Sequence, residues 1–199
     1  MQPDVHRRAV TGKGRKLSNT SDTKLNDAAL VARARAGDRR AFPELLRRHE
    51  DAVYRVCYRI LGNREDAKDA TQEAFIRVYD RLDTFEGRSA FRTWLLRLSV
   101  NVSLNLRKKR GDDVQELPPE RLLGADLEPG PEERAVTSEQ LEWLQKALGH
   151  LDDNHRAAVV LRDLEGLSYA EISEVLDVPE GTARVWAYRG RRRLKDLLT

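Results

Sequence analysis

The segment that decides the fold lies near the end of the chain, where residues 166–194 read GLSYAEISEVLDVPEGTARVWAYRGRRRL. Ser168 and Glu171 form a capping-box pattern, in which each side chain bonds the backbone N–H of the other residue at a helix start. Apolar residues then recur at helical spacing until residues 177–179, where a proline ends the helix. A second helix is expected to follow residues 180–182. Two helices joined by so short a turn are typical of a helix-turn-helix.

The second helix of this motif carries residues suited to DNA. In a helix-turn-helix, the second helix enters the major groove and presents its N-terminal residues to the base edges. Arg184 is the best candidate for base reading, because a guanidinium can donate two hydrogen bonds to guanine. Thr182 and the free N–H groups at the helix start suit a phosphate. Arg189, Arg191 and Arg192 are expected to bind phosphates, which adds affinity without sequence choice. Basic helix pairs also occur in proteins that do not bind DNA.

The rest of the chain is helical in pattern. Residues 25–110 carry apolar residues at helical spacing, and no stretch alternates as a strand would. Asn63, three residues before Asp66, marks a helix start, because its side chain can accept a hydrogen bond from the first N–H groups. Cys57 lies on an apolar helical face and is expected to be buried. The fold class is therefore expected to be all-α, with two small helical domains, the second a four-helix domain that contains the helix-turn-helix.

Two stretches break this pattern. Residues 1–24 are rich in Gly, Ser, Thr and basic residues, so we expect a disordered basic tail there. Residues 111–137 contain four prolines, which a regular helix does not tolerate. We expect this second stretch to be a flexible acidic linker between a domain at residues 25–110 and a domain at residues 138–199.

The net charge of +3 conceals a sorting of charge along the sequence. Residues 107–110 are four consecutive cations, and residues 184–195 hold six cations and no acid. Between these blocks, residues 111–137 contain eight acids against two arginines. Two basic patches joined by an acidic segment indicate two separate contacts with a polyanion, although either block alone is equally well explained as a solvated helix face.

Composition argues against several functional classes. The longest apolar run is far shorter than a membrane span, and residues 1–24 lack the apolar core of a secretory signal, so we expect a cytoplasmic protein. The lone Cys57 rules out a disulfide framework and a multi-cysteine metal site. The four histidines show no metal-ligand spacing, and no Gly-rich phosphate loop is present. We therefore expect no enzyme, no metal, no cofactor and no small-molecule substrate.

A second chemical signal lies in residues 82–110, which read LDTFEGRSAFRTWLLRLSVNVSLNLRKKR. Aromatic side chains beside a basic track suit single-stranded nucleic acid, because bases stack on the rings while cations hold the backbone. A flipped base can also be read on its exposed edge, for which Asn101 is both donor and acceptor. Phe91 and Trp94 are expected to be ordinary core residues. For Phe85, which lies in a predicted turn, both a core role and a binding role stay open.

Taken together, three stretches resemble the extracytoplasmic-function sigma factors of the sigma-70 family. They are residues 82–110, residues 166–194, and residues 63–79, which read NREDAKDATQEAFIRVY. The resemblance implies an RNA polymerase subunit with two conserved regions joined by a linker. The first domain would melt the promoter and read the −10 element, capturing a flipped base. The second domain would read the −35 element as duplex.

The resemblance assigns roles to individual residues. The residues implied for the −10 element and its single strand are Phe85, Arg88, Asn101, Asn105, Arg107 and Lys108. Those implied for the −35 element are Thr182, Arg184, Val185, Trp186, Tyr188, Arg189, Arg191 and Arg192. Val185 and Trp186 depart from the family pattern, which has a small polar and a basic residue there. This apolar pair either contacts a thymine methyl group or changes the preferred upstream sequence.

The resemblance also implies protein partners. Core RNA polymerase would be bound through the coiled coil and the flap, and an anti-sigma factor would inhibit the chain. The residues implied for the coiled coil of the largest polymerase subunit are Asp66, Asp69, Gln72 and Glu73. From chemistry alone, a solvated acidic face is the default for such a helix, so this role rests on the resemblance only.

One alternative function remains at this point, a stand-alone helix-turn-helix transcription regulator. Such a regulator should bind specific duplex DNA without polymerase, whereas a sigma factor should bind it poorly.

Overall fold

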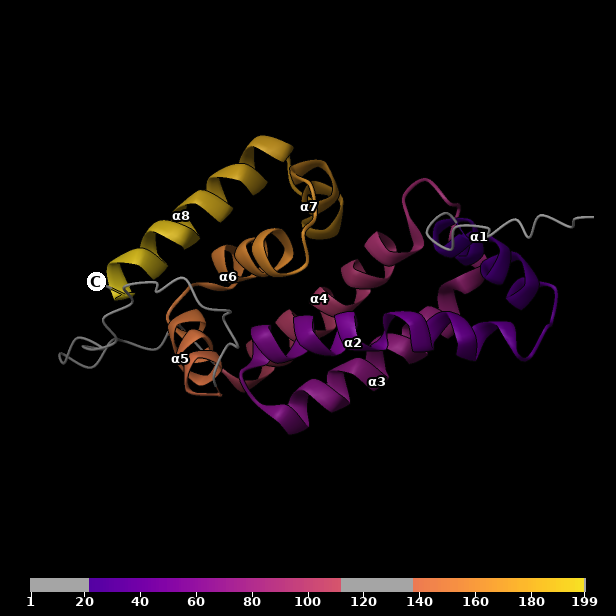
Figure 1. Cartoon of the computed structure of the whole chain (residues 1–199), viewed down its shortest axis with the longest axis horizontal. Coiled ribbons are helices and arrows are strands. Elements are labelled where there is room, and N and C mark those ends of the chain that lie inside the picture. Colours follow the sequence, from indigo (N-terminus) through magenta and orange to yellow (C-terminus); the bar gives the residue numbers. More distant parts are fainter. Residues whose placement is uncertain (1–21, 112–137, 199) are drawn as a thin grey trace, which may run out of the picture.

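The computed structural model describes residues 22–111 and 138–198. Within these ranges every regular element is helical, which confirms the all-α fold class (Figure 1). The predicted linker, apart from Gly111, and most of the predicted tail lie outside the described residues. The first helix starts at Asp22, inside the predicted tail at residues 1–24, so helix begins slightly earlier than expected. None of the described helices is long and apolar enough to cross a membrane.

The first half of the molecule is built around three long helices. Asn63 caps one of them as predicted, since its side chain accepts hydrogen bonds from the N–H groups of Glu65 and Asp66. Gly62 ends the helix before it in the left-handed conformation, at φ 76°, which glycine adopts without strain. In chain order the elements are α1 (Asp22–Arg35), α2 (Ala41–Leu61), α3 (Arg64–Arg81), the short 3₁₀ helix η1 (Leu82–Thr84) and α4 (Phe91–Arg110).

Small side chains let α2, α3 and α4 approach closely. Ser99 and Ser103 of α4 are fully buried, and their hydroxyl groups donate to the backbone carbonyls one turn earlier, each at 2.9 Å. Cys57 of α2 is also fully buried, as the apolar pattern predicted, and burial raises the pKa of its thiol. The buried face of α3 includes three alanines, Ala67, Ala70 and Ala74.

The second half consists of four helices, with a π-helical segment extending one of them. These elements are α5 (Ser138–Gly149), α6 (Asp153–Val159) with its π-helical continuation η2 (Val160–Leu164), α7 (Tyr169–Leu176) and α8 (Glu180–Leu198). A single glycine allows two of these helices to cross closely. A Cβ atom added at Gly190 of α8 would lie 2.5 Å from the Cγ2 of Val159 in α6. This explains a glycine inside a helix, where its own preference is unfavourable.

The helix-turn-helix is confirmed in its local detail. The Ser168 hydroxyl accepts a hydrogen bond from the Glu171 N–H at 3.2 Å, and the Glu171 carboxylate accepts one from the Ser168 N–H at 2.8 Å. Asp177 ends α7 in the left-handed conformation, at φ 56°. The second helix begins at Glu180, so it includes residues 180–182 rather than following them.

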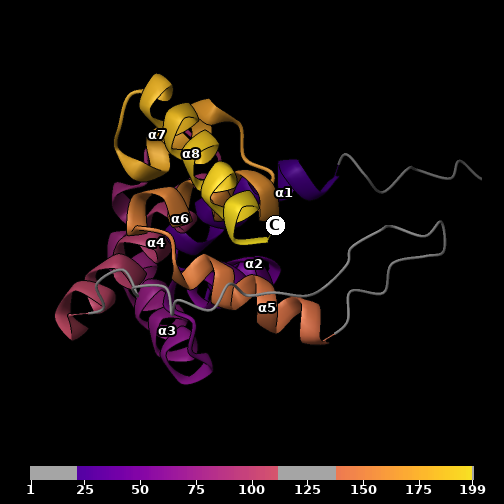
Figure 2. The same ribbon diagram turned by 90° about the vertical axis from the view of Figure 1, so that its left-hand side faces the viewer.

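The two halves pack against each other, which the sequence did not predict. The orange and yellow helices of the second half lie along one side of α2 and α4, with α5 beside one end of α2 (Figures 1 and 2). One hydrophobic cluster contains buried residues from both halves, including Leu95 of α4 and Ile172 of α7. Buried apolar surface therefore stabilises the contact between the halves as well as each half.

Candidate nucleic-acid interfaces

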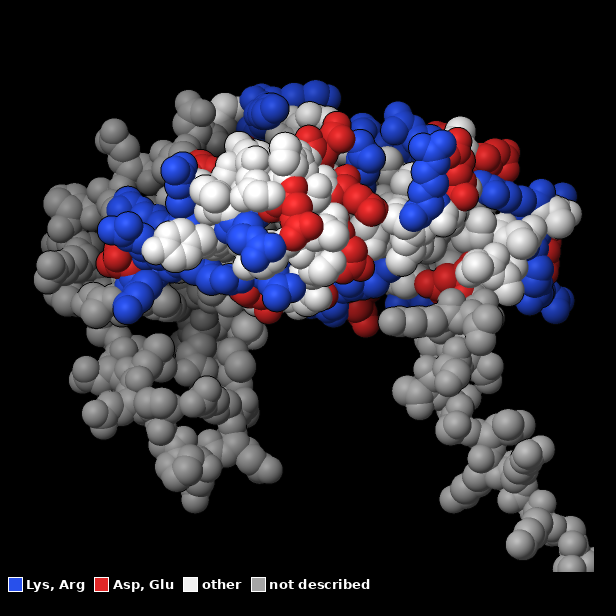
Figure 3. Space-filling view, turned by 90° about the horizontal axis from the view of Figure 1, so that it is seen from above, with Lys and Arg blue, Asp and Glu red and all other residues white. Residues whose placement is uncertain are grey.

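The second helix of the helix-turn-helix presents an exposed surface along α8. Lys and Arg side chains gather over this part of the molecule (Figure 3). Among them are two large apolar side chains, Val185 at 44% and Tyr188 at 62% exposure. Arg189 and Arg192 are exposed as well, whereas Trp186 is half-buried. The surface thus combines cations for phosphates with apolar groups that can contact bases.

Arg184 lies near the start of this surface with its guanidinium held in place. The Nη2 atom of Arg184 is 2.9 Å from the Oε1 atom of Glu180, one turn earlier. Its guanidinium carbon lies 4.8 Å from the centroid of the Tyr169 ring. The side chain is nevertheless 62% exposed, so it can reach a ligand.

The start of α8 differs from the prediction in one respect. The N–H groups of Thr182 and Ala183 donate to the Pro179 carbonyl, at 2.9 and 3.1 Å. These two N–H groups are therefore not available to a phosphate, while the predicted phosphate contact by Thr182 and the helix start stays a prediction. The Thr182 side chain is half-buried.

Arg191 is also engaged within the protein. Its Nε donates to the Oδ2 of Asp163 at 2.8 Å, and its Nη2 lies 3.5 Å from the Tyr169 hydroxyl. The hydrogen bond to Asp163 raises the pKa of Arg191 further above its ordinary value. A phosphate contact by Arg191 would have to share the guanidinium with Asp163.

The aromatic cluster of the first half is only partly open. Phe85 is 8% exposed and packs on Phe91 and Trp94, with ring centroids 5.7 and 5.1 Å away. Phe91 is buried, as expected of a core residue, whereas Trp94 is half-buried. Phe85 and Trp94 line a groove of about 600 Å³, whose opposite wall is the turn of the helix-turn-helix, including Asp177. The groove thus lies between the two halves.

Three of the predicted −10 residues share one face of α4. Asn101, Asn105 and Lys108 are all exposed, and their spacing places them on the same side of the helix. In the loop before α4, the Arg88 side chain is 86% exposed and pairs with Glu86 at 2.5 Å. Arg88 lines the same groove as Phe85, whereas Asn101, Asn105 and Lys108 do not line it.

Arg107 takes part in the contact between the two halves. It is 7% exposed, and its Nε donates to the Oδ1 of Asp153 in the second half at 2.7 Å. Arg107 is therefore covered in this conformation, and its contact with a DNA strand stays a prediction. The reason is the ion pair with an acid 46 residues away, which no local pattern indicates.

The acidic face of α3 is mostly where the sequence placed it. Asp69, Gln72 and Glu73 are exposed. Asp66 differs, because its side chain is 14% exposed and pairs with Arg110 at the end of α4. It therefore does not belong to the open acidic surface in this conformation.

Two apolar residues extend this face and were missed by the sequence analysis. Ile76 is 57% exposed and Tyr79 is 69% exposed, one and two turns beyond Gln72. The signal that could have found them is their spacing of four and seven residues from Gln72, which places them on the same side of the helix as the polar face. Large apolar side chains at such exposure are typical of surfaces that bind a partner protein.

The contact between the halves contains a buried carboxylate, also missed by the sequence analysis. The Glu165 side chain is 1% exposed. Its oxygens accept from Arg55 of α2 at 3.0 and 3.2 Å and from Arg92 of α4 at 2.6 Å. Both arginines are partly solvent-exposed, so one buried anion of the second half is shared by two cations of the first.

Arg156 reinforces the same contact. It is 1% exposed and donates to the carbonyl oxygens of Leu148, Gly149 and Leu151, at 2.7, 2.9 and 2.6 Å. A further bond, at 3.1 Å, reaches the carbonyl of Ile60 in α2. One guanidinium thus satisfies the end of α5 and joins it to the first half.

Comparison with known families divides the chain in the same way. The family model for Sigma-70 region 2 matches residues 45–112, and the model for Sigma-70 region 4 matches residues 141–194. The first match covers the helices that carry the aromatic groove and the acidic face. The second covers the helix-turn-helix.

Similar proteins extend these matches over most of the chain. It is 43% identical over 166 residues to the ECF RNA polymerase sigma factor SigE of Mycolicibacterium smegmatis, covering 81% of this chain and 64% of that protein. It is 35% identical over 176 residues to the ECF sigma factor SigW of Bacillus subtilis, covering 84% of this chain and 94% of SigW. The chain is 36% identical over 178 residues to the ECF sigma-E factor of Escherichia coli K12, and the match covers 85% of this chain and 93% of that protein.

Two solved structures share the arrangement. CnrH in complex with the cytosolic domain of CnrY aligns with a TM-score of 0.67 and 26% identity, over 87% of this chain and 97% of CnrH. The sigma factor RpoE in complex with the anti-sigma factor NepR, from Bartonella quintana, aligns with a TM-score of 0.60 and 23% identity. This alignment covers 79% of this chain and 96% of RpoE. The second likeness supports the fold alone.

Proposed function

The chain belongs to the ECF RNA polymerase sigma factors of the sigma-70 family, and from this premise we propose which of its surfaces performs each step of initiation. Sigma factors bind core RNA polymerase and promoter DNA and are not themselves catalytic. The chain therefore directs promoter recognition and transcription initiation. A stand-alone regulator is not supported, because such a protein has no need of the region 2 match at residues 45–112.

The upstream, −35 element is proposed to bind along α8 as duplex DNA. The exposed guanidinium of Arg184 suits a guanine, and Val185 and Tyr188 present apolar surface to the bases. Arg189 and Arg192 are exposed cations that suit phosphates. Trp186 and Thr182 are half-buried, which favours supporting roles over direct reading.

The −10 element is proposed to bind the first half as a separated strand. Asn101, Asn105 and Lys108 line one exposed face of α4, and Arg88 extends from the adjacent loop. An aromatic ring at the wall of a groove can stack on an unpaired base, which supports Phe85 as part of the site. Arg107 can take part only if its ion pair with Asp153 opens.

Core polymerase is proposed to bind α3. The supporting feature is the combination of polar Asp69, Gln72 and Glu73 with apolar Ile76 and Tyr79 on one side of the helix. Protein interfaces commonly pair an apolar centre with a polar rim. A contact of the second half with the polymerase flap rests on family membership alone.

Two further proposals rest on the relatives. The solved structures contain CnrH with the cytosolic domain of CnrY and RpoE with the anti-sigma factor NepR, so we expect this chain to have an anti-sigma factor. Since its targets are polymerase and promoter DNA, we expect it to act in the cytoplasm.

The observation that carries the proposal is the presence, on one chain, of both sigma regions with an exposed basic surface on α8. The test is transcription in vitro by core polymerase with and without the purified chain, followed by sequencing of the transcript starts. Starts at a fixed distance from a shared two-part sequence are expected. Starts that do not depend on the chain, or that share no upstream sequence, would contradict the proposal.

A further inference from the structure

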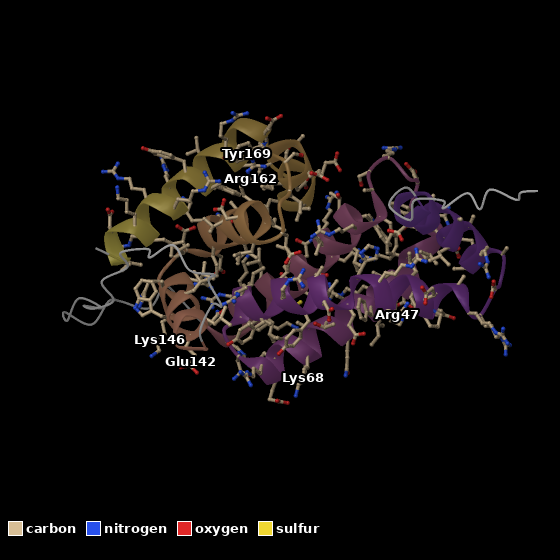
Figure 4. All side chains as sticks on the ribbon, in the orientation of Figure 1. Arg47, Lys68, Glu142, Lys146, Arg162 and Tyr169 are labelled. Carbon is tan, nitrogen blue, oxygen red and sulfur yellow. The ribbon has the colours of Figure 1, made fainter. Side chains whose placement is uncertain are left out.

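Tyr169 occupies an unusual position between the two helices of the helix-turn-helix. It is the first residue of α7, directly after the capping residue Ser168, and its side chain is half-buried. Figure 4 shows Tyr169 and Arg162 side by side, near the N-terminal end of α8. The guanidinium carbons of Arg162 and Arg184 lie 4.7 and 4.8 Å from the centroid of the Tyr169 ring. One ring thus contacts two cations that come from different elements.

The ring is held from several sides. The capping box fixes the backbone where α7 begins. Arg162 donates to the carbonyl of Leu167 at 2.7 Å, so its guanidinium has a defined place against the ring. The Tyr169 hydroxyl lies 3.5 Å from Arg191, which is itself bound to Asp163. The platform beneath Arg184 is therefore ordered before DNA arrives.

Such a platform affects how Arg184 can bind. An exposed arginine samples many rotamers, and ordering it on a base costs conformational entropy. A cation over an aromatic ring is attracted to the ring's face, and a planar guanidinium stacks on it. With the Tyr169 ring on one side and Glu180 one turn earlier, the Arg184 guanidinium is restricted to a position over the start of α7. The Arg184 side chain then loses less conformational entropy when it binds a base.

We propose that Tyr169 is a positioning residue for promoter reading, whose ring orients the Arg184 guanidinium toward the edge of a base in the upstream element. The inference rests on the proposed role of Arg184 and adds a residue of α7 to the determinants of sequence choice. Tyr169 need not touch DNA for this effect. Its contribution is expected only at the base that Arg184 reads.

The experiment uses the full chain with core polymerase and a template library randomised over the upstream element, with enrichment of each base among the transcripts as readout. Tyr169→Leu removes the ring, and Tyr169→Phe keeps it. We expect Tyr169→Leu to reduce discrimination about two- to fivefold at one base position, the range of an exposed cation–π contact. We expect Tyr169→Phe to stay close to the wild type, because the ring and not the hydroxyl faces Arg184. In the Arg184→Ala background, Tyr169→Leu should cause no further loss at that position.

Tyr58→Leu is the matched control. Tyr58 is a half-buried tyrosine of α2, with the guanidinium carbon of Arg59 5.7 Å from its ring centroid, far from α8 in the sequence. It should leave upstream discrimination unchanged, while melting temperatures measure the effect of each variant on stability.

Several results would overturn the inference. Unchanged discrimination in Tyr169→Leu, an equal loss at every base, or the same loss in the Arg184→Ala background would reduce Tyr169 to a packing residue. Even then, Arg184 keeps its proposed role in base reading if Arg184→Ala alone reduces discrimination at one base position. If Arg184→Ala relaxes none, both the inference and the base-reading role of Arg184 fail.

Discussion

The two surfaces proposed to bind DNA differ in how open they are. On α8, Val185 and Tyr188 are 44% and 62% exposed. In the first half, Phe85 and Arg107 are 8% and 7% exposed. The upstream surface is thus assembled and accessible, whereas in the downstream surface Phe85 packs within its own half and Arg107 is covered by the other half. The difference matches the two ligands, since duplex DNA exists before polymerase acts and a separated strand does not.

The covering contact is chemically specific. Arg107 binds Asp153, and Arg55 and Arg92 bind Glu165, so cations of the first half are neutralised by acids of the second. These acids occupy cations that a phosphate backbone would also attract. For Arg107 to bind the −10 strand, its ion pair with Asp153 must open, and we expect the halves to move apart when it does.

Arg156→Ala should produce the largest effect, by removing the residue that joins α5 to the first half. It would leave four carbonyl oxygens, three of them in buried contacts, without this donor, so we expect a loss of about 3–5 kcal/mol in the free energy of unfolding. Arg156→Lys should restore little of it, because an ammonium cannot reproduce the planar fork. Urea unfolding measures both, with Arg193→Ala at an exposed position of α8 as the control. A loss under about 1 kcal/mol would show that the carbonyls find other donors.

Glu165→Gln should weaken the contact between the two halves while leaving each half folded. The variant removes the charge shared by Arg55 and Arg92, and we expect a cost of about 2 kcal/mol, typical of hydrogen bonds to a charged group. Limited proteolysis between the halves should speed up, with Glu174→Gln, an exposed acid of α7, as the control. Equal rates in the wild type and in Glu165→Gln would mean that the contact between the halves does not depend on the Glu165 charge.

Gly190→Ala tests the upstream surface on α8, because the added methyl group disturbs the packing of α8 against α6. The new methyl group would lie 2.5 Å from Val159 and 3.0 Å from the His155 carbonyl. Overpacking should outweigh the better helix propensity of alanine, for a net loss of about 1–2 kcal/mol. Gly181→Ala is the matched control in the same helix, since nothing lies within 4 Å of its added Cβ. Thermal unfolding should therefore separate the two variants, and equal melting temperatures would refute the close helix crossing.

Acid pH should have the smallest effect. Hydrogen bonds from Ser168, first of all from its backbone N–H, lower the pKa of Glu171 at the start of α7. A depressed pKa in the folded state means that the stabilisation is present above the ordinary carboxyl pKa and is lost as the pH falls through the folded value. We expect the Glu171 carboxylate to contribute about 0.5 kcal/mol to the free energy of unfolding, a small value because solvent screens this partly exposed group. Between pH 5 and 3 the melting temperature of Glu171→Gln should fall less than that of the wild type; parallel curves would contradict this.

The comparison also shows what the sequence can reveal. The helix-turn-helix was predictable because its signals are local, a capping box at Ser168 and a proline at residue 179. The all-α class and the burial of Cys57 followed from helical spacing in the same way. These features depend on residues a few positions apart.

The covered surface was not predictable, because its partners are distant in the chain. Arg107 lies in a run of four cations that suits DNA, yet Asp153 of the other half binds it. Glu165 gave no signal of a buried anion, since both arginines that surround it lie in the first half. Gly190 lies inside a basic run, and nothing in that run indicates the close crossing of α8 and α6.

The distance between the halves, in the free chain and in the promoter complex, tests this account most directly. Fluorophores at Asp80→Cys in α3 and Asp196→Cys in α8 would report it by energy transfer, and the buried Cys57 should stay unlabelled. We expect high transfer in the free chain and a clear decrease on binding core polymerase and promoter. Transfer that stays the same in the initiating complex would contradict the claim that the downstream surface is uncovered by separation of the halves.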